Sequence, residues 1–273
     1  SLIYMEALII NYEKNFELIF IFLLGIIIGS FLNTVTYRLP IMLGVEKKPE
    51  YFKVFNLFTP RSHCEVCKII IPFYFNIPVA SYLILKRRCF NCKSSIPCEY
   101  AMIELLTGLT FLGLALSMDS LNELIFMSFL CCSLIVLAVI DLKYLILPNY
   151  ITYSLIFLGL LINLLFEIVP FSHAILGCFL GYSVFFLIEK FFYFIKQVDG
   201  LGRGDAKLIA AIGAWMGLDY LPLIIFIAAC LGIIFFIITI KINKKTLSQS
   251  KGLQIPFGTF LAISCIVIIP ITS

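Results

Sequence analysis

Two aspartates, Asp141 and Asp205, lie at the ends of apolar segments of this 273-residue chain. Water is scarce at the edge of a bilayer, so a carboxylate there is costly unless it meets a polar cavity, a partner or a proton. Two such acids are functional candidates and indicate acid–base chemistry. Each also has a structural alternative: Asp141 could pair with Lys143 at the membrane boundary, and Asp205 could cap a helix that begins near Lys207.

The second acid follows a glycine-rich run that reads Gly200-Leu201-Gly202-Arg203-Gly204-Asp205. Glycines let the backbone turn tightly and let a substrate strand approach closely. The run is not a dinucleotide-binding fingerprint, because no strand precedes it and no soluble βαβ unit surrounds it. We therefore predict that Gly202 and Gly204 form an active-site loop beside Asp205.

Four cysteines form two CxxC pairs, Cys64 with Cys67 and Cys89 with Cys92, separated by 21 residues. Each pair can turn two thiolates toward one ion, and this spacing suits a tetrahedral zinc site. Cytoplasmic thiols stay reduced, which disfavours disulfides, while a redox role or unliganded cysteines remain alternatives. His63 adjoins the first pair, but four thiolates already complete the shell. The predicted cofactor is a structural zinc ion.

The elements that position these groups are predicted to be membrane helices. The chain is 62% hydrophobic and 13% charged, and its apolar runs of about 20 residues match the thickness of a bilayer. The predicted fold is an all-α polytopic membrane protein with about eight transmembrane helices and a cytoplasmic zinc-binding loop domain. The expected spans are Phe16–Tyr37, Ala101–Ser117, Leu121–Ile140, Tyr150–Ile168, Ala174–Ile195, a short helix from Lys207, a full helix ending at Ile240, and Leu253–Ile271.

The distribution of basic residues predicts the orientation. Ten of the 20 Lys and Arg residues fall between Arg38 and Lys93, so this segment is expected in the cytoplasm. Breaking the long run near Gly217 to Pro222 returns the later basic turns to that side, including Lys241, Lys244, Lys245 and Lys251. Both aspartates then meet the cytoplasmic face. Membrane topology explains the charge better than nucleic-acid binding, because no base-stacking or groove-reading motif is present.

Beyond these features, an ordered set of motifs resembles the type IV prepilin leader peptidases, membrane aspartic proteases of the GxGD class. The similar segments run through nearly the whole chain: Gly29–Asn33, Tyr37–Pro40, Asn76–Pro78, Glu104–Gly108, Asp141 with Leu147–Asn149, Gly202–Asp205 with Lys207–Leu208, and Ile255–Gly258. The chain departs from the family at Glu99 and Ala101, where Arg and Pro are common, and at Thr259, where Pro is common.

The resemblance implies an activity for the two acids. A member of this family cleaves prepilins or pseudopilins after a Gly that ends a short basic leader, at the cytoplasmic face of the bacterial inner membrane. Asp141 and Asp205 would be catalytic: one, ionised, removes a proton from water, and the other, protonated, polarises the scissile carbonyl. The proton belongs to the pair, so neither acid is assigned as the base.

Family members with the cysteine-bearing loop are typically also N-methyltransferases that use S-adenosylmethionine on the new amine. The resemblance therefore divides the chain into residues 1–37, an N-terminal tail and first transmembrane helix, 38–97, a methyltransferase-associated zinc loop, and 98–273, a transmembrane peptidase domain. Candidate residues for methyl transfer or substrate binding are Asn33, Arg38 and Glu104. Their structural alternatives are helix packing, charge anchoring and an interfacial salt bridge.

An ion-coupled transporter is the alternative from another functional class, because intramembrane acids and Gly-broken helices also mark ion paths. A transporter would pair the acids with transported cations and would not require the zinc loop. The peptidase prediction names prepilins and the lipid bilayer as partners and excludes nucleic acid.

Overall fold

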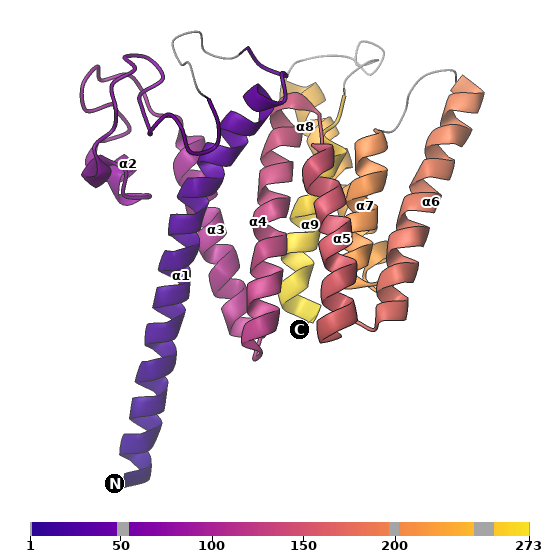
Figure 1. Cartoon of the computed structure of the whole chain (residues 1–273), viewed down its shortest axis with the longest axis horizontal. Helices are drawn as coiled ribbons and strands as arrows, with labels where there is room; N and C mark the ends of the chain where they lie inside the picture. Colours follow the sequence, from indigo (N-terminus) through magenta and orange to yellow (C-terminus); the bar gives the residue numbers. More distant parts are fainter. Residues whose placement is uncertain (1, 48–54, 197–201, 243–253, 273) are drawn as a thin grey trace. The chain divides into compact units, whose positions relative to one another are not determined.

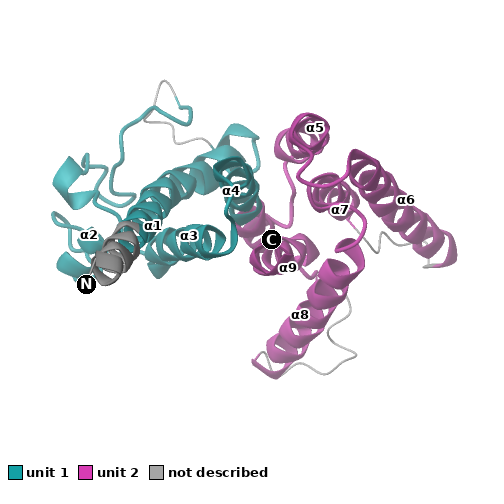
Figure 2. Ribbon diagram, turned by 90° about the horizontal axis from the view of Figure 1, so that it is seen from below, with its two compact units in different colours: residues 1–136, 273 teal, residues 137–272 magenta. Residues whose placement is uncertain are grey.

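A computed structural model describes residues 2–47, 55–196, 202–242 and 254–272. Several residues used in the sequence predictions lie outside this part: Gly200 and Leu201 of the glycine run and the basic residues Lys244, Lys245 and Lys251. Contacts divide the chain into two compact units, residues 1–136 with 273 and residues 137–272, which Figure 2 colours separately. The division at residues 37 and 97 remains a prediction.

Unit 1 contains the first long helices and the cysteine-bearing loop. Helix α1 spans Leu2–Met42, α3 spans Cys98–Ser117, and most of α4, Leu121–Tyr144, follows. The loop between α1 and α3 carries a 3-10 turn, η1 (Phe73–Phe75), and the short helix α2 (Ala80–Ile84). It folds beside the end of α1 and the start of α3 (Figure 1).

Glycines let α1 and α3 pack at short range. A Cβ on Gly25 would lie 2.9 Å from the Gly108 Cα, and one on Gly29 would lie 2.8 Å from the Glu104 Cα. Such close approach of two backbones is typical of small residues in membrane helix pairs. The contact at Gly29 brings the second half of α1 directly against the Glu104 turn of α3.

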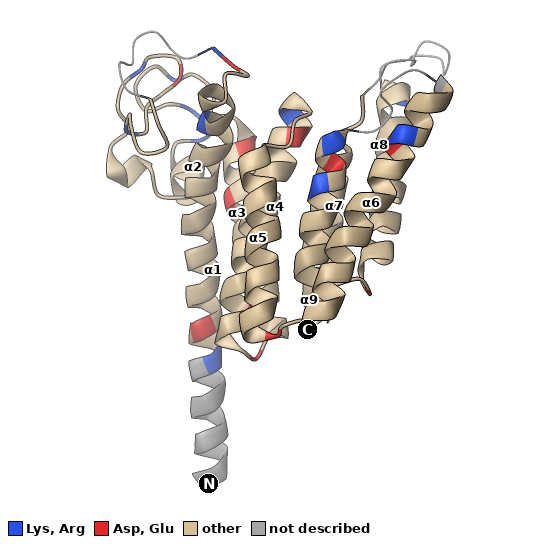
Figure 3. Ribbon diagram, turned by 45° about the vertical axis from the view of Figure 1, so that its right-hand side comes forward, with Lys and Arg blue, Asp and Glu red and all other residues tan. Residues whose placement is uncertain are grey.

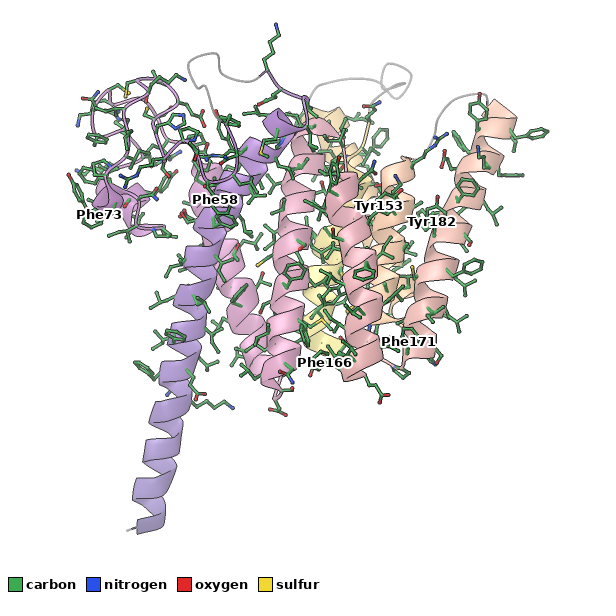
Figure 4. The ribbon with its side chains drawn as sticks, in the orientation of Figure 1. Phe58, Phe73, Tyr153, Phe166, Phe171 and Tyr182 are labelled. Carbon is green, nitrogen blue, oxygen red and sulfur yellow. The ribbon has the colours of Figure 1, made fainter. Side chains whose placement is uncertain are left out.

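Unit 2 contains the end of α4 and five further helices: α5 (Asn149–Phe166), α6 (Phe171–Lys196), α7 (Arg203–Met216), α8 (Leu221–Ile242) and α9 (Phe257–Thr272). Its acidic and basic residues concentrate at the end of α4, the second half of α6 and the start of α7 (Figure 3). Phe166 and Phe171, labelled in Figure 4, mark the turn between α5 and α6 at the other end of the unit.

The all-α membrane architecture is confirmed, but the predicted count of eight spans is not. Within the described residues, six helices are long and apolar enough to cross a membrane. Helix α7 has 14 residues and α9 has 16. At roughly 1.5 Å per residue, α7 is about 21 Å long and falls short of about 30 Å of hydrocarbon. The predicted number of eight spans is therefore not confirmed, although the predicted break between the short and the full helix is present, between Met216 and Leu221.

Helix α7 is buried along most of its length because other helices of unit 2 pack around it. A Cβ on Gly213 would lie 2.4 Å from the carbonyl oxygen of Gly177, so α6 and α7 touch through their backbones. Gly181 of α6 also serves close packing, since a Cβ there would meet the Ile209 side chain at 3.0 Å.

Two polar side chains of the α5–α6 region and α7 fix the far end of α7. The Asn163 amide donates to the carbonyl of Ala214 at 2.8 Å, and its Oδ1 accepts the Val169 N–H at 2.9 Å. The Trp215 indole N–H donates to the Leu155 carbonyl at 2.8 Å. The bond from Asn163 satisfies a carbonyl that the last turn of α7 would otherwise leave without a partner. These bonds hold α7 in register, so the position of its first turn is fixed.

Candidate active site and metal centre

Asp141 lies in the last turns of α4 and is 5% exposed. Its Oδ2 accepts a hydrogen bond from the backbone N–H of Thr259 at 2.7 Å and lies 3.1 Å from the Thr259 hydroxyl. That hydroxyl is also 3.0 Å from the Ala138 carbonyl, so its single proton is shared between two acceptors. The start of α9 is thereby joined to the end of α4, and donors of this kind stabilise a carboxylate.

Asp205 lies within the first turn of α7 and is 9% exposed. The N-cap of this helix is Gly202, with extended backbone angles and no side-chain cap hydrogen bond. The alternative in which Asp205 caps a helix starting near Lys207 is therefore wrong, because the helix already begins at Arg203. The Asp205 carboxylate instead lies near the N-terminus of α7, where the peptide dipoles favour negative charge.

The two carboxylates meet at Gly258, at the start of α9. A Cβ built on Gly258 would lie 3.1 Å from Oδ2 of Asp141 and 3.2 Å from Oδ1 of Asp205. These two oxygens are therefore no farther apart than the sum of those distances, although 63 residues of sequence separate the acids. Two carboxylates this close favour a state in which they share one proton.

The turn that carries Asp205 is held from both sides. Nε of Arg203 donates to Glu189 of α6 at 3.2 Å, and Nζ of Lys207 donates to Oδ1 of Asn149 of α5 at 2.7 Å. The Lys207 ammonium also lies 5.0 Å from the ring centroid of Tyr153, which Figure 4 labels. These contacts connect the first turn of α7 to α6 and α5. They therefore fix the position of the backbone from which the Asp205 side chain extends.

Leu147 forms the apolar wall of this site. A Cβ on Gly204 would come within 3.0 Å of its Cβ, and one on Gly258 within 2.8 Å of its Cδ1. Gly204 therefore supplies room for the Leu147 side chain. Of the predicted active-site loop, Gly202 is the N-cap of α7 and Gly204 lies inside its first turn, so the described part of the run is mostly helical. A role for these glycines in the active site remains a prediction.

The four cysteines of unit 1 form a cluster of the kind that could hold a metal ion. Their sulfur atoms all lie within 4.8 Å of one another, with Cys64 and Cys92 at 3.8 Å and Cys67 and Cys89 at 4.0 Å. Tetrahedral zinc with Zn–S bonds of about 2.3 Å requires sulfur separations of about 3.8 Å. The residues therefore fit a tetrahedral metal site.

The two CxxC turns have the same backbone pattern. In the first, the Lys68 N–H donates to the Cys64 carbonyl at 2.9 Å, and in the second the Lys93 N–H donates to the Cys89 carbonyl at 3.2 Å. Both lysines have a φ of +59°. A bridge between His63 and Ile70 encloses the first turn, and one between Arg88 and Ser95 encloses the second. Two equivalent turns thus present their thiols to one point, without His63 in the cluster.

One thiol of the cluster favours its metal-binding form. The Ser94 hydroxyl lies 3.0 Å from Sγ of Cys92. Hydrogen bonds from the side chain and backbone of Ser94 lower the pKa of Cys92 to about 6. Since the thiolate is the form that binds metal, the loop lowers the proton cost of metal binding.

The three polar candidates Asn33, Arg38 and Glu104 all line one cavity of unit 1, with a volume of about 290 Å³. The Asn33 amide donates to the Tyr100 carbonyl at 2.9 Å and lies 3.4 Å from Oε1 of Glu104. The Arg38 guanidinium donates to three loop carbonyls, those of Asn56, Leu57 and Pro60. The structure thus brings all three together, with Arg38 directed to the loop backbone.

Thr259 is the residue whose contact the sequence did not reveal. Its only signal was a departure from the family pattern at the position after Gly258. A proline there has neither the N–H nor the hydroxyl that Asp141 meets in this chain. The backbone hydrogen bond therefore requires a residue other than proline at this position, and the side-chain contact requires a hydroxyl.

Comparison with known proteins identifies relatives along nearly the whole chain. The model of the bacterial peptidase A24 N-terminal domain matches residues 23–118, and that of the type IV leader peptidase family matches residues 128–237. A prepilin leader peptidase/N-methyltransferase of Legionella pneumophila is 36% identical over 95% of this chain and 93% of its own length. The protein of the same name from Aeromonas salmonicida is 38% identical over 91% of this chain and 88% of its own length. That from Neisseria gonorrhoeae is 37% identical over 88% of this chain and 86% of its own length.

No solved structure matches the chain significantly. The relatives' names favour a peptidase over the transporter alternative. With this identity and coverage, and with two family models matched in order, the chain belongs to the type IV leader peptidase family.

Proposed function

We propose that this protein cleaves the leader peptides of prepilins or pseudopilins and then methylates the new N-terminus. The relatives named prepilin leader peptidase/N-methyltransferase support both activities. The observation that carries the peptidase proposal is the meeting of two carboxylates at Gly258, where a residue without a side chain leaves space beside both. A water molecule held there contacts a base on one side and an acid on the other.

In the proposed reaction, the ionised aspartate removes a proton from this water, whose oxygen attacks the scissile carbonyl. The protonated aspartate donates a hydrogen bond to the carbonyl oxygen, on which negative charge develops. Collapse of the tetrahedral species breaks the C–N bond, and a proton passes to the departing amine. We assign the base role to Asp141, because the donors of Thr259 stabilise its charged form.

The site is proposed to open to the cytoplasm from a bacterial inner membrane. The basic loop between Arg38 and Lys93 supports this orientation, because positive charge beside membrane spans stays on the cytoplasmic side. A short basic leader would then reach the acids without crossing the bilayer. The substrates would be pilins or secretion-system pseudopilins.

For the second activity, unit 1 is the proposed methyltransferase part, with zinc as the ion of the cysteine cluster. S-adenosylmethionine would supply an activated methyl group, so that the substrate amine forms an N–C bond as the S–C bond breaks and then loses a proton. The cluster residues Cys64, Cys67, Cys89 and Cys92 would hold the ion and fold the loop around it.

The peptidase proposal is tested with purified protein in detergent and a synthetic prepilin, whose cleavage is followed by mass. Asp141→Asn and Asp205→Asn should each abolish cleavage, because each removes one of the two proton-transfer groups. Asp219→Asn is the matched control: this exposed acid pairs with His173 at the opposite end of α7 and should leave cleavage unchanged. Undiminished cleavage by either active-site variant rejects the mechanism. A gain of about 14 mass units on the cleaved chain, given donor, reports methylation.

A further inference from the structure

The cavity of unit 1 has a buried carboxylate that its own side chains do not neutralise. Glu104 is 8% exposed and lines the cavity. Its Oε2 accepts the Val79 N–H at 2.7 Å, and its Oε1 lies 3.4 Å from the Asn33 amide nitrogen. Within the described residues, Glu104 forms no ion pair with Lys or Arg. Buried acids are normally paired with a cation, so this one calls for a partner.

The one arginine of the cavity wall is committed elsewhere. Arg38 is 5% exposed, and its Nη1 donates to the carbonyls of Asn56 and Leu57 at 3.0 and 3.1 Å, while its Nη2 donates to that of Pro60 at 2.6 Å. These bonds use three of the five guanidinium N–H donors and fasten the loop to α1. The charge of Glu104 is therefore left for something that enters the cavity.

A second acceptor beside Glu104 also lacks a partner. The Asn33 amide nitrogen faces two acceptors, the Tyr100 carbonyl and Glu104, which fixes the orientation of the amide. Its Oδ1 is buried and has no hydrogen-bond partner among the described residues. Buried polar atoms without partners are rare in folded proteins. The wall beside Glu104 thus has an acceptor whose hydrogen bond is not satisfied by the described residues.

The rest of the wall suits an organic molecule with a flat apolar part. Phe75 and Phe90 stack with ring centroids 5.3 Å apart, and both line the cavity with Tyr37, Tyr82 and Tyr100. Aromatic faces attract organic cations as well as planar rings. A volume of about 290 Å³ accommodates a small organic ligand and far exceeds one metal ion. The ligand should therefore combine a cationic group with an apolar part.

We propose that this cavity binds the ammonium group of a methyl-transfer reactant, with Glu104 as its anionic anchor. The inference rests on the methylation proposed above. Two reactants carry such a group: S-adenosylmethionine, through its amino-acid part, and the mature substrate, through its new N-terminus. All the lining residues belong to unit 1, whereas both aspartates belong to unit 2, so ligand binding here is separable from cleavage.

The cysteine cluster contributes to the cavity wall. Cys64 and Cys89 are lining residues, together with Ser94 beside the second CxxC turn. The hydroxyl of Tyr100, in α3, donates a hydrogen bond to Oε1 of Glu65 in the first CxxC turn at 2.6 Å. The cluster therefore shapes the site, and its disruption should weaken ligand binding even though no cysteine is assigned a chemical step.

Glu104→Gln tests the proposal, with Glu99→Gln as the matched control, because Glu99 lies on the same helix and is not among the lining residues. Equilibrium dialysis measures binding of labelled S-adenosylmethionine. Fluorescence anisotropy measures binding of a synthetic mature peptide with a free or an acetylated N-terminus. Loss of a buried charge partner should lower the affinity for one of these two ligands by at least about 30-fold. Glu99→Gln should bind both ligands as the wild type does.

The two arms distinguish the sources of the ammonium. Weaker donor binding identifies S-adenosylmethionine as the occupant, whereas weaker binding of the free-amine peptide, with the acetylated peptide unaffected, identifies the substrate amine. Glu104→Gln should retain its metal and unfold at the temperature of the wild type, which shows that it is folded. If Glu104→Gln binds both ligands and methylates as the wild type does, the inference is overturned while the proposed function stands. If the wild type itself neither cleaves nor methylates, the proposed function fails.

Discussion

The space at Gly258 gives the sharpest prediction, because a single methyl group should fill the place between the two acids. In Gly258→Ala, the new Cβ would lie 3.1 and 3.2 Å from the carboxylate oxygens of Asp141 and Asp205. Both distances are tighter than ordinary van der Waals contact, so a methyl group would displace the attacking water and push the carboxylates apart. A displacement of about 1 Å at a reacting centre costs about 100-fold in rate, and we expect a loss of kcat of at least about that size.

The assay is cleavage of a synthetic prepilin by purified protein, followed by mass, with thermal unfolding measured alongside. Gly232→Ala in α8 is the matched control, because its Cβ would meet the Phe260 ring at an ordinary 3.6 Å. It should retain full activity and be slightly more stable, since alanine favours a helix interior. Activity of Gly258→Ala within about threefold of the wild type would refute the reasoning.

A second outcome would also contradict it. The Cβ of Gly258→Ala would lie 2.8 Å from Cδ1 of Leu147, the far end of a flexible side chain. If this contact alone caused the loss, adding Leu147→Ala would restore cleavage by giving the methyl room. We expect no rescue, because the crowding against both carboxylates remains.

The remaining predictions concern the contacts that hold the two sites. Thr259→Val keeps the backbone N–H but removes the hydroxyl that contacts Asp141, so kcat should fall about 10-fold, consistent with one hydrogen bond to a charged group. Thr259→Ser keeps a hydroxyl and should have the kcat of the wild type. Equal kcat values for the wild type and both variants would exclude a role for the hydroxyl. Cys67→Ser should remove stoichiometric zinc, measured by elemental analysis, whereas Cys98→Ser, outside the cluster, should retain it; unchanged metal in the first variant rejects the site. Asn163→Ala leaves the Ala214 carbonyl and the Val169 N–H without partners, so unfolding should become easier by about 1–3 kcal/mol, seen as a lower Tm; an unchanged Tm would mean that this bonding does not stabilise α7.

The sequence predicted features that depend on local pattern. Long apolar runs and their breaks located the helices to within a few residues for α3 to α6, because hydrophobicity and turn residues act over short stretches of chain. The run before Asp205 and the spacing of the two CxxC pairs indicated a tight turn and a four-thiol cluster, since both are properties of consecutive backbone. The start of α7 was placed four residues late, because Gly202 to Gly204 indicate a turn and also permit a helix to begin.

Tertiary packing decided what no local pattern contains. The place where Asp141 and Asp205 meet is set by Gly258, whose significance lies in the absence of a side chain where three segments converge. The donors of Thr259, the cap on α7 from Asn163 and the cavity beside Glu104 likewise join residues separated by 25 to 118 positions. Such contacts depend on how helices pack in three dimensions. The sequence therefore determined which groups can perform chemistry, and the fold determined which of them face one another.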